Sequence, residues 1–372
     1  MKALVLYTNT GGGHRSAARA TAEALEKLSV KVELVDTLGI AGKHVSERTS
    51  KIYNTVVRKS PVIFGMFYSA GKSVSKPNKR SIVYRLNSLY APKLNSIIRE
   101  EKPDIIVCTH LFAGQTVTQI EKKFGLNAVT SAIITDYTYS PMWEETALDY
   151  YFIPHKDLIS QFTKKQIPEE KIFPMGLPVK SAFKLHGNKR EAKLKNGYDP
   201  DKFHILIAGG SMGAGSIFDT AICLSENMRD AAVTIICGSN EKLFDKLKSQ
   251  SFNKNIKILK VTEKMPELMD CADIIITKPG GLTSTEAMVK GMPFIIITPI
   301  PGGEEDNCDF FVKRNMAVYS KSTYETVELC NMFREDHHVT VQMIEAQRKN
   351  MYPDSGSEIA RFLIDKVRDR RE

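Results

Sequence analysis

Residues 203–216 read FHILIAGGSMGAGS, an apolar run that ends in a turn containing four glycines. Short apolar runs rich in β-branched residues predict buried strands, and glycines directly after a strand let the backbone approach a ligand closely. The start of the chain repeats this order: KALVLY at residues 2–7 precedes a glycine cluster at residues 11–13 and a predicted helix at residues 14–28. The repeated strand–turn–helix pattern predicts two α/β halves, each built on a parallel sheet.

Further short apolar runs occur on both sides of the chain's middle. The predicted strands are residues 30–35, 104–108 and 128–134 in the first half, and residues 233–237, 256–260, 273–277 and 294–298 in the second. The sequence predicts two Rossmann-like domains that face each other across a cleft, with ligands bound at the carboxyl ends of the strands. The expected boundaries are 1–178, 179–350 and 351–372, with a linker at 176–201. The last segment, 351–372, is a charged amphipathic helix, for which packing back on the first domain is one option.

The composition fits a globular protein of about two domains. The 372 residues are 42% hydrophobic and 26% charged, which excludes disordered, collagen-like and small disulfide-rich classes. The six cysteines form no CxxC pair, so we expect free thiols in a reducing compartment. The apolar run near the N-terminus is too short for a signal peptide, and the longest uncharged apolar stretch, residues 62–71, is about half of a membrane span. These features predict a cytoplasmic protein without a transmembrane helix.

The net charge of +9 is concentrated in one segment. Residues 43–93 hold eleven Lys or Arg and one acid, whereas the remainder holds 41 basic and 42 acidic residues. A local excess of this size predicts an anionic partner at that segment. A nucleic acid would explain the charge, but the chain shows no nucleic-acid-binding motif and that partner would leave the glycine loops unused.

Two glycine-rich loops each allow a purely structural and a functional interpretation. In TGGGHRS, at residues 10–16, His14 either caps a helix or acts as a base in the cleft. In GGSMGAGS, at residues 209–216, the backbone amides either form a simple turn or bind a diphosphate. The second loop lacks the Gly-Lys-Ser/Thr of a Walker A motif.

The strongest motif is DIIITKPGGLTSTE at residues 273–286. A buried strand, a Pro-Gly-Gly turn and a helix beginning near Leu282 place Glu286 about one turn inside that helix. There its carboxylate can accept hydrogen bonds from a ribose diol, or it simply complements the helix N-terminus. Thr283 and Ser284 can cap this helix or contact phosphate. The acids of PIPGGEEDN, at residues 299–307, either bind sugar hydroxyls or form a solvated loop.

No metal-binding pattern accompanies these motifs. Asp199 and Asp201 form the only D-x-D in the chain and lie in a proline turn, and His337 and His338 lie on a polar helix. H-E-x-x-H is absent. We therefore expect a mechanism without a metal or other cofactor.

These motifs together resemble glycosyltransferase family 28. The similarity is densest at residues 261–311, and the loop at 11–16 with Thr135-Asp136-Tyr137 is similar to the glycolipid branch: monogalactosyldiacylglycerol synthases and processive diacylglycerol glucosyltransferases. It extends from Thr8 to about Asn350. The resemblance implies a GT-B fold whose first domain binds the acceptor and whose second binds a UDP-sugar.

The resemblance also implies roles for individual residues. His14 would be the base of an inverting displacement, and Asp136 would support it or serve only as a turn residue. Glu286 would hold the uridine ribose, and helix-start amides would stabilise the departing UDP. The implied donor-binding residues are Gly12, Gly13, Gly209, Gly210, Ser211, Met212, Gly213, Val261, Met265, Pro279, Gly280, Gly281, Leu282, Thr283, Glu286, Gly303, Glu304 and Asn307.

The basic segment then fits a membrane-facing role. VIFGMFY, at residues 62–68, is flanked by cations that would attract an anionic lipid surface while apolar groups insert, although a core helix with solvated lysines has the same pattern. The candidate membrane or acceptor contacts are Arg58, Lys59, Ile63, Phe64, Phe67 and Trp143.

The expected function is transfer of a hexose from a UDP-sugar to diacylglycerol by a peripheral enzyme on the inner face of the cell membrane. The alternatives are a polyprenyl-linked cell-wall acceptor, epimerisation of UDP-N-acetylglucosamine, and a non-catalytic UDP-sugar sensor. Ser140 stands where many relatives carry histidine, and Gly303 where relatives often carry glutamine. The donor therefore stays open among glucose, galactose and N-acetylglucosamine.

Overall fold

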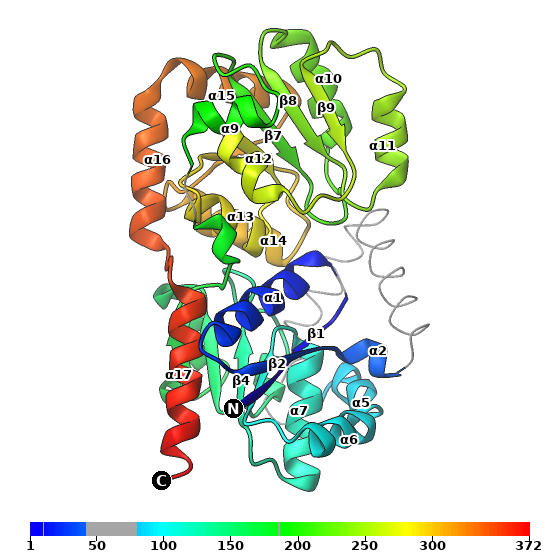
Figure 1. Ribbon diagram of the computed structural model, residues 1–372, viewed down its shortest axis with the longest axis vertical. Coiled ribbons are helices and arrows are strands. Elements are labelled where there is room, and N and C mark those ends of the chain that lie inside the picture. The colour runs from blue at the N-terminus through cyan, green and yellow to red at the C-terminus, as the bar shows by residue number, and fades with distance from the viewer. Residues whose placement is uncertain (10, 42–79, 185–186) are drawn as a thin grey trace. The chain divides into compact units, whose positions relative to one another are not determined.

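Two separate parallel sheets organise the chain (Figure 1). The structure is a computed structural model that describes residues 1–9, 11–41, 80–184 and 187–372. The chain divides into two compact units. The first unit comprises residues 1–181, 301–303 and 352–372, and the second comprises residues 182–300 and 304–351. Each unit is an α/β domain with a six-stranded sheet, the fold class that the sequence predicts.

The sheet of the first unit has the order β2-β1-β3-β4-β5-β6, with every neighbouring pair parallel. The residues of β3 and β4 are all buried, as expected for a parallel sheet covered on both faces. The strands are β1 (Lys2–Tyr7), β2 (Lys31–Asp36), β3 (Ile105–Cys108), β4 (Val129–Ile133), β5 (Tyr150–Ile153) and β6 (Ile172–Pro174). The helices are α1 (Gly12–Glu26), α2 (Thr37–Ala41), α5 (Ile82–Ser88), α6 (Ala91–Glu101), α7 (Leu111–Phe124), α8 (Ile159–Thr163) and α17 (Ser355–Asp369), with 3-10 turns η1 (Trp143–Glu145), η2 (Lys156–Leu158) and η3 (Glu169–Lys171).

The C-terminal helix α17 belongs to the first unit, where it packs against α1 (Figure 1, red and blue). Its apolar stripe is fully buried at Ile359, Ala360 and Leu363. Gly356 lies where the two helices meet, because a Cβ there would be in van der Waals contact with the Cβ of Ala24 at 3.4 Å. Phe362 adds an aromatic contact with Phe173, whose ring centroid is 4.6 Å away. The last segment of the chain therefore completes the core of the first unit.

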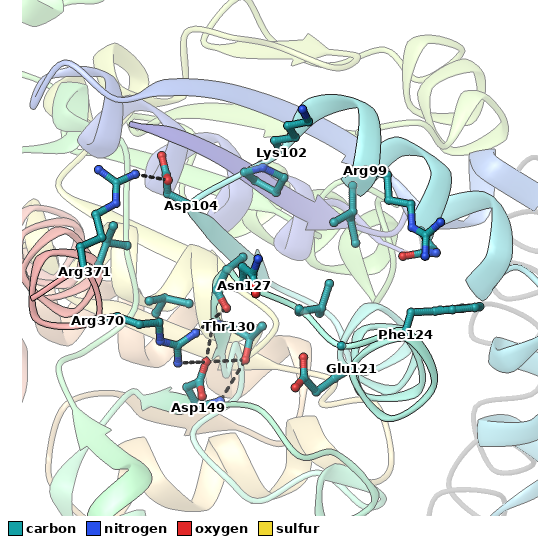
Figure 2. A pocket seen from close by; sticks show the side chains of 18 of the residues that line it. Arg99, Lys102, Asp104, Glu121, Phe124, Asn127, Thr130, Asp149, Arg370 and Arg371 are labelled. Carbon is teal, nitrogen blue, oxygen red and sulfur yellow. Dashed lines mark hydrogen bonds and ion pairs between the residues drawn. The ribbon is translucent and has the colours of Figure 1, made fainter.

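A cavity of about 1160 Å³ lies at the amino ends of β3 and β4, at the opposite edge of the sheet from the glycine loop (Figure 2). Two arginines after α17 anchor that helix at its rim. Arg371 Nη2 lies 2.5 Å from Asp104 Oδ1, and Arg370 donates to Ala128 O at 2.8 Å and pairs with Asp149. Basic side chains near helix C-termini complement the helix dipole, which explains their presence here without a ligand.

The second sheet has the order β12-β11-β10-β7-β8-β9, again all parallel. Its strands are β7 (His204–Ala208), β8 (Ala232–Ile236), β9 (Ile256–Leu259), β10 (Ile274–Thr277), β11 (Phe294–Ile297) and β12 (Val318–Ser320). Its helices are α9 (Lys189–Lys195), α10 (Ile217–Asn227), α11 (Glu241–Lys248), α12 (Met265–Cys271), α13 (Gly281–Val289), α14 (Gly303–Val312), α15 (Thr323–Glu335) and α16 (His337–Asn350); η4 (Ser181–Phe183) precedes them.

The strand order reverses between β1 and β3 in the first sheet and between β7 and β10 in the second. At such a switch point the following loops diverge to opposite faces, and the carboxyl ends of the two strands frame a ligand crevice. Each unit thus has one switch point, and each predicted glycine loop begins there.

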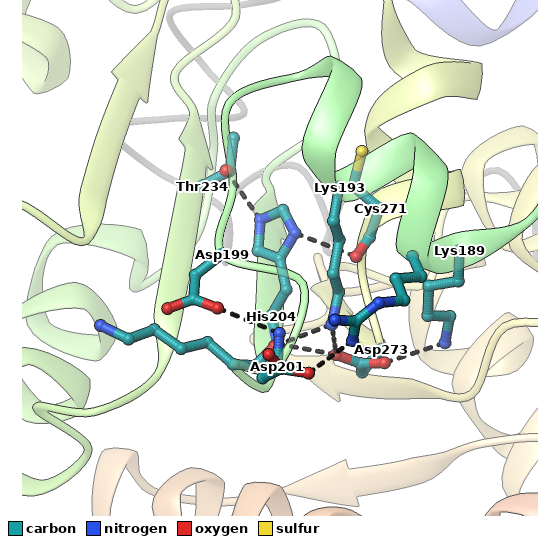
Figure 3. Close-up of polar contacts among 10 residues, drawn as sticks. Lys189, Lys193, Asp199, Asp201, His204, Thr234, Cys271 and Asp273 are labelled. Atoms are coloured by element: carbon teal, nitrogen blue, oxygen red, sulfur yellow. Dashed lines mark hydrogen bonds and ion pairs between the residues drawn. The ribbon is translucent and has the colours of Figure 1, made fainter.

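The predicted linker at 176–201 is wrong in part, because it contains α9, which packs on α12. The buried Lys193 of this helix donates to Asp273 Oδ2 at 2.8 Å and to Lys202 O at 2.7 Å (Figure 3). Beside this pair, fully buried His204 contacts Cys271 O through Nδ1 at 3.1 Å and Thr234 Oγ1 through Nε2 at 2.9 Å. This polar network fixes α9 to the amino edge of the second sheet.

The predicted acidic loop at 299–307 is also wrong in part. Residues 303–307 form the start of α14, so Glu304, Glu305 and Asp306 lie in a first helical turn. Carboxylates there are stabilised by the helix dipole, which accounts for three successive acids without a ligand.

Candidate functional site

The switch point of the first unit positions His14 near the start of α1. Its Nδ1 lies 2.8 Å from the carbonyl oxygen of Thr109, the residue that follows β3. Because a carbonyl only accepts, Nδ1 carries the proton and the neutral ring has its lone pair on Nε2. The Thr109 hydroxyl donates to His14 O at 3.0 Å, and Thr135 Oγ1 lies 3.2 Å from the same Nδ1. These contacts from the ends of β3 and β4 hold the imidazole of His14 in one tautomer.

A second histidine, His110, packs against His14. The ring centroids lie 4.4 Å apart with an interplanar angle of 82°. His110 is also the N-cap of α7, where its Nδ1 accepts from the Phe112 amide at 3.1 Å. The sequence interpretation missed His110. The available signal was its place directly after the predicted strand 104–108, which a parallel sheet brings beside residue 14.

Burial keeps both imidazoles neutral. Desolvation lowers the pKa of His14 below its ordinary value, while the carboxylate of Asp136 and the carbonyl of Thr109 act in the opposite direction. The pKa of His110 lies well below the ordinary value, first because of burial and second because of neighbouring His14. A neutral imidazole held by its Nδ1–H can accept a proton at Nε2 near neutral pH, which is the requirement for a general base.

The remaining predicted residues of the first unit fall into three places. Gly12 and Gly13 are the first two residues of α1, where amides lack intrahelical partners. Trp143 is 4% exposed and packs against Gly114 and Tyr151, so we correct its assignment as a membrane contact to one in the core. Arg58, Lys59, Ile63, Phe64 and Phe67 lie outside the described residues.

The glycine loop after β7 is a tight, backbone-built turn. Gly213 N donates to Gly210 O at 3.1 Å and Ala214 N to Gly209 O at 3.1 Å. Gly210 and Gly213 have φ of +67° and +56°, a region that favours glycine. A Cβ on Gly209 would lie 2.3 Å from Ile217 Cδ1. The contact at Gly209 and the positive φ of Gly210 and Gly213 therefore disfavour a side chain at these positions. Ser211 and buried Met212 lie between them.

The turn after β10 leads into α13, which begins at Gly281 with Gly280 as N-cap. Pro279 precedes this cap, and buried Leu282 anchors the first turn. Thr283 and Glu286 are the two residues of α13 that are not fully buried. Residues three apart share a helix face, so these two polar side chains are presented together. These are two side chains of α13 for which the sequence predicts contacts with phosphate and ribose.

Lys278 brings the two turns together, and the sequence interpretation missed it. Its Cε lies 3.0 Å from the position that a Cβ on Gly210 would take, and its Nζ lies 3.7 Å from that position on Gly280. The ammonium forms an ion pair with Glu304, whose other oxygen accepts from Ile300 N at 3.1 Å. The available signal was again position, because Lys278 directly follows the strand beside β7.

Four other predicted donor residues lie at different places in the second unit. Asn307 is fully buried and donates to Pro279 O at 3.0 Å, so it braces the turn before α13. Val261 is 70% exposed, and Met265 is the first residue of α12. Gly303 is the first residue of α14. Within the described residues, no group of three or more His, Cys, Asp or Glu could hold a metal ion.

Comparisons with known proteins find family models that match both halves of the chain. The family model of monogalactosyldiacylglycerol (MGDG) synthase matches residues 14–179, and that of the glycosyltransferase family 28 C-terminal domain matches residues 204–335. The first half of this chain thus carries an MGDG synthase domain, and the second half carries a glycosyltransferase family 28 C-terminal domain. Both candidate sites lie within the matched ranges, apart from Gly12 and Gly13.

Relatives that are named as glucosyltransferases match over nearly the whole chain. A processive diacylglycerol beta-glucosyltransferase of Staphylococcus carnosus is 26% identical over 361 residues, covering 95% of this chain and 90% of the relative. One of Bacillus cytotoxicus is 26% identical over 369 residues, covering 98% and 93%.

Solved structures share the fold of this chain at lower identity. The UDP-GlcNAc 2-epimerase of Neisseria meningitidis bound to UDP-GlcNAc matches with a TM-score of 0.65 at 15% identity, covering 98% of this chain and 100% of that one. MurG of Acinetobacter baumannii matches with a TM-score of 0.61 at 14% identity, covering 98% and 99%. The expected GT-B architecture of paired α/β domains is thereby confirmed.

Proposed function

We propose that this chain is an inverting glycosyltransferase that moves a hexose from a UDP-sugar to diacylglycerol. The observation that carries the chemistry is the tautomer of His14, whose Nδ1–H points at Thr109 O and leaves Nε2 as the proton acceptor. The acceptor class is supported by relatives that are named diacylglycerol glucosyltransferases and align over nearly their full length.

In the proposed reaction, one bond forms as another breaks. The acceptor hydroxyl oxygen attacks the anomeric carbon of the sugar, and its proton passes to Nε2 of His14. The bond from that carbon to the diphosphate oxygen breaks, and its electron pair leaves with UDP. Asp136 raises the pKa of His14 and so favours the imidazolium that forms.

The second unit would hold the donor and offset the charge that develops on UDP. The proposed ribose ligand is Glu286, beside Thr283 on the same face of α13. Amides of the turn around Gly210 and of the first turn of α13 would face the phosphates. We assign no metal or organic cofactor to this reaction, which uses groups of the chain alone.

A helix of the first unit supports an approach to lipid. On α5 and at its C-cap, Ile82, Leu86 and Leu89 are 76%, 57% and 77% exposed and recur at helical spacing on one face. Basic Arg85 is on the same helix, which lies within the cation-rich segment 43–93 of the sequence. Apolar groups among cations fit an anionic bilayer surface. The structure describes no helix long and apolar enough to cross a membrane. We propose peripheral attachment at the inner face of the cell membrane.

The decisive experiment measures UDP release from UDP-glucose, UDP-galactose and UDP-N-acetylglucosamine, with and without diacylglycerol in anionic vesicles. We expect release from one donor that depends on diacylglycerol and falls about 10²–10⁴-fold in His14→Ala. His337→Ala, at an exposed position on α16, is the matched control and should retain full activity. Release that needs a polyprenyl-linked acceptor instead would refute the acceptor, and UDP-sugar binding without any turnover would favour a sensor.

Vesicle flotation tests the membrane surface separately. The double variant Leu86→Gln/Leu89→Gln should float less with anionic vesicles than the unsubstituted chain, because two exposed apolar contacts are lost. Leu194→Gln removes a leucine that is 58% exposed on α9 of the second unit and should float normally. Equal flotation of all three proteins would show that α5 does not contact lipid.

A further inference from the structure

The donor-binding residues taken from the sequence include no cation. They comprise glycines, apolar residues, small polar residues and the carboxylates Glu286 and Glu304. A nucleoside diphosphate brings further negative charge to these carboxylates, and burying like charges together is unfavourable without a compensating cation. Backbone amides supply only partial charges, so the site as predicted lacks a full positive charge for the phosphates.

Lys278 supplies such a charge at the place where the two turns meet. Its side chain is 13% exposed and lies over Gly210, where the missing Cβ leaves room for the lysine Cε. Its Nζ lies 3.9 Å from the position of a Cβ on Gly210 and 3.7 Å from that on Gly280. The ammonium therefore stands between the loop after β7 and the N-terminus of α13.

The carboxylate of Glu304 holds this ammonium, and its own side chain is 15% exposed. The Ile300 amide donates to the other carboxylate oxygen at 3.1 Å, so Glu304 sits in a defined place at the start of α14. A carboxylate and a phosphate are similar partners for the Lys278 ammonium, because both offer oxygen acceptors that share a negative charge.

We propose that Lys278 is a diphosphate-binding residue and that Glu304 occupies its ammonium until the nucleotide displaces it. This inference rests on the proposed function, because it assumes a nucleoside diphosphate donor in the second unit. On binding, the Lys278 ammonium passes from the Glu304 carboxylate to a phosphate oxygen. The released carboxylate is then available to the donor's sugar hydroxyls. When the sugar leaves, Lys278 offsets the negative charge that the bond cleavage leaves on UDP.

This exchange gives the two partners opposite effects on nucleotide affinity. Lys278→Gln should weaken UDP binding about 10–100-fold, as expected for loss of a charge-assisted contact. Glu304→Gln should strengthen UDP binding about two- to fivefold, because the competing ion pair is removed. Uridine, which has no phosphate, should bind all variants equally.

The test is calorimetric titration of the full chain with UDP and with uridine. The double variant Lys278→Gln/Glu304→Gln keeps a neutral pair that can still hydrogen-bond, so it removes any destabilisation from a lone buried carboxylate. It should bind UDP as weakly as Lys278→Gln. Lys313→Gln is the matched control: it removes the lysine of an exposed ion pair with Asp309 on α14 and should leave UDP affinity unchanged.

Three results would overturn the proposal. Recovery of normal UDP affinity in the double variant would show that Lys278 only neutralises Glu304. Weaker UDP binding in Glu304→Gln would show that the carboxylate does not compete. An equal loss of uridine and UDP affinity in Lys278→Gln would place the lysine's effect outside the phosphates. If the unsubstituted chain binds no UDP, the proposed donor class itself fails, whereas UDP binding without transfer to diacylglycerol leaves this proposal standing.

Discussion

Replacing Gly213 by alanine is expected to destabilise the second unit more than the same change at Gly197. Both glycines have left-handed backbones, with φ of +56° and +68°. An L-residue in that region costs about 1–2 kcal/mol, and both variants bear this cost. They differ in what the new methyl group meets. At Gly197 the neighbour is the end of the Lys257 side chain at 3.7 Å, whereas at Gly213 it is the carbonyl oxygen of Cys237 at 2.0 Å.

The difference follows from that contact. Real Cβ atoms essentially never approach other atoms closer than 3.0 Å, so one of the two backbones must move by about 1 Å. Asn240 Nδ2 donates to Gly213 O at 2.9 Å and Ser239 N to Ser211 O at 2.9 Å, and both bonds resist this movement. Overpacking of this kind costs about 1–3 kcal/mol. We therefore expect a total of about 2–5 kcal/mol for Gly213→Ala and about 1–2 kcal/mol for Gly197→Ala.

Urea denaturation followed by far-ultraviolet circular dichroism measures the difference as a shift in midpoint. A titration with UDP measures its consequence for the site, since a displaced loop should weaken UDP binding in Gly213→Ala only. Equal midpoints for the two variants would refute the argument that these loops are rigidly packed. Unchanged UDP affinity in a destabilised Gly213→Ala variant would instead remove the loop from the donor site.

Two pH-dependent predictions follow from buried histidines. Because burial lowers the pKa of His14, the acidic limb of kcat/KM should have its midpoint below pH 6.5. Asp136→Asn should move this midpoint further down, since the Asp136 carboxylate raises the pKa of His14. A pH–rate profile with a midpoint above 6.5 would contradict this prediction. Burial also lowers the pKa of His204 to about 4, so the unfolded chain takes up a proton there before the folded chain does. The second unit should keep this stability above pH 6.5 and lose up to about 3 kcal/mol of it as the pH falls toward 4, and His204→Gln should flatten the dependence of the urea midpoint on pH.

The sequence predicts the central strands well because they are buried on both faces. Residues 2–7 match β1, and the runs at 104–108 and 294–298 match β3 and β11 within a residue or two. The strands without a prediction, Tyr150–Ile153, Ile172–Pro174 and Val318–Ser320, lie toward sheet edges and are three or four residues long. Such short segments give no periodic apolar signal.

Errors in the second unit have a different cause. The helix Lys189–Lys195 reads KREAKLK, and its buried residue is Lys193, whose charge is met by Asp273, 80 residues away in the sequence. The pairing of His14 with His110, and of Lys278 with Glu304, likewise depends on which strands are neighbours. Local patterns identify the loops that carry the chemistry, but the partners come from the order of strands in the sheet.

The return of α17 to the first unit has a consequence for how the protein is made. The strands and helices up to residue 181 are synthesised long before the segment 352–372 that completes their core. During that interval the face of α1 around Ala20 and Ala24, which α17 covers, stays open to solvent and to other chains. A nascent chain therefore cannot finish its first unit before its second has been translated. An isolated fragment ending at residue 181 should expose this apolar face and aggregate, whereas adding a peptide with the α17 sequence in trans should protect it.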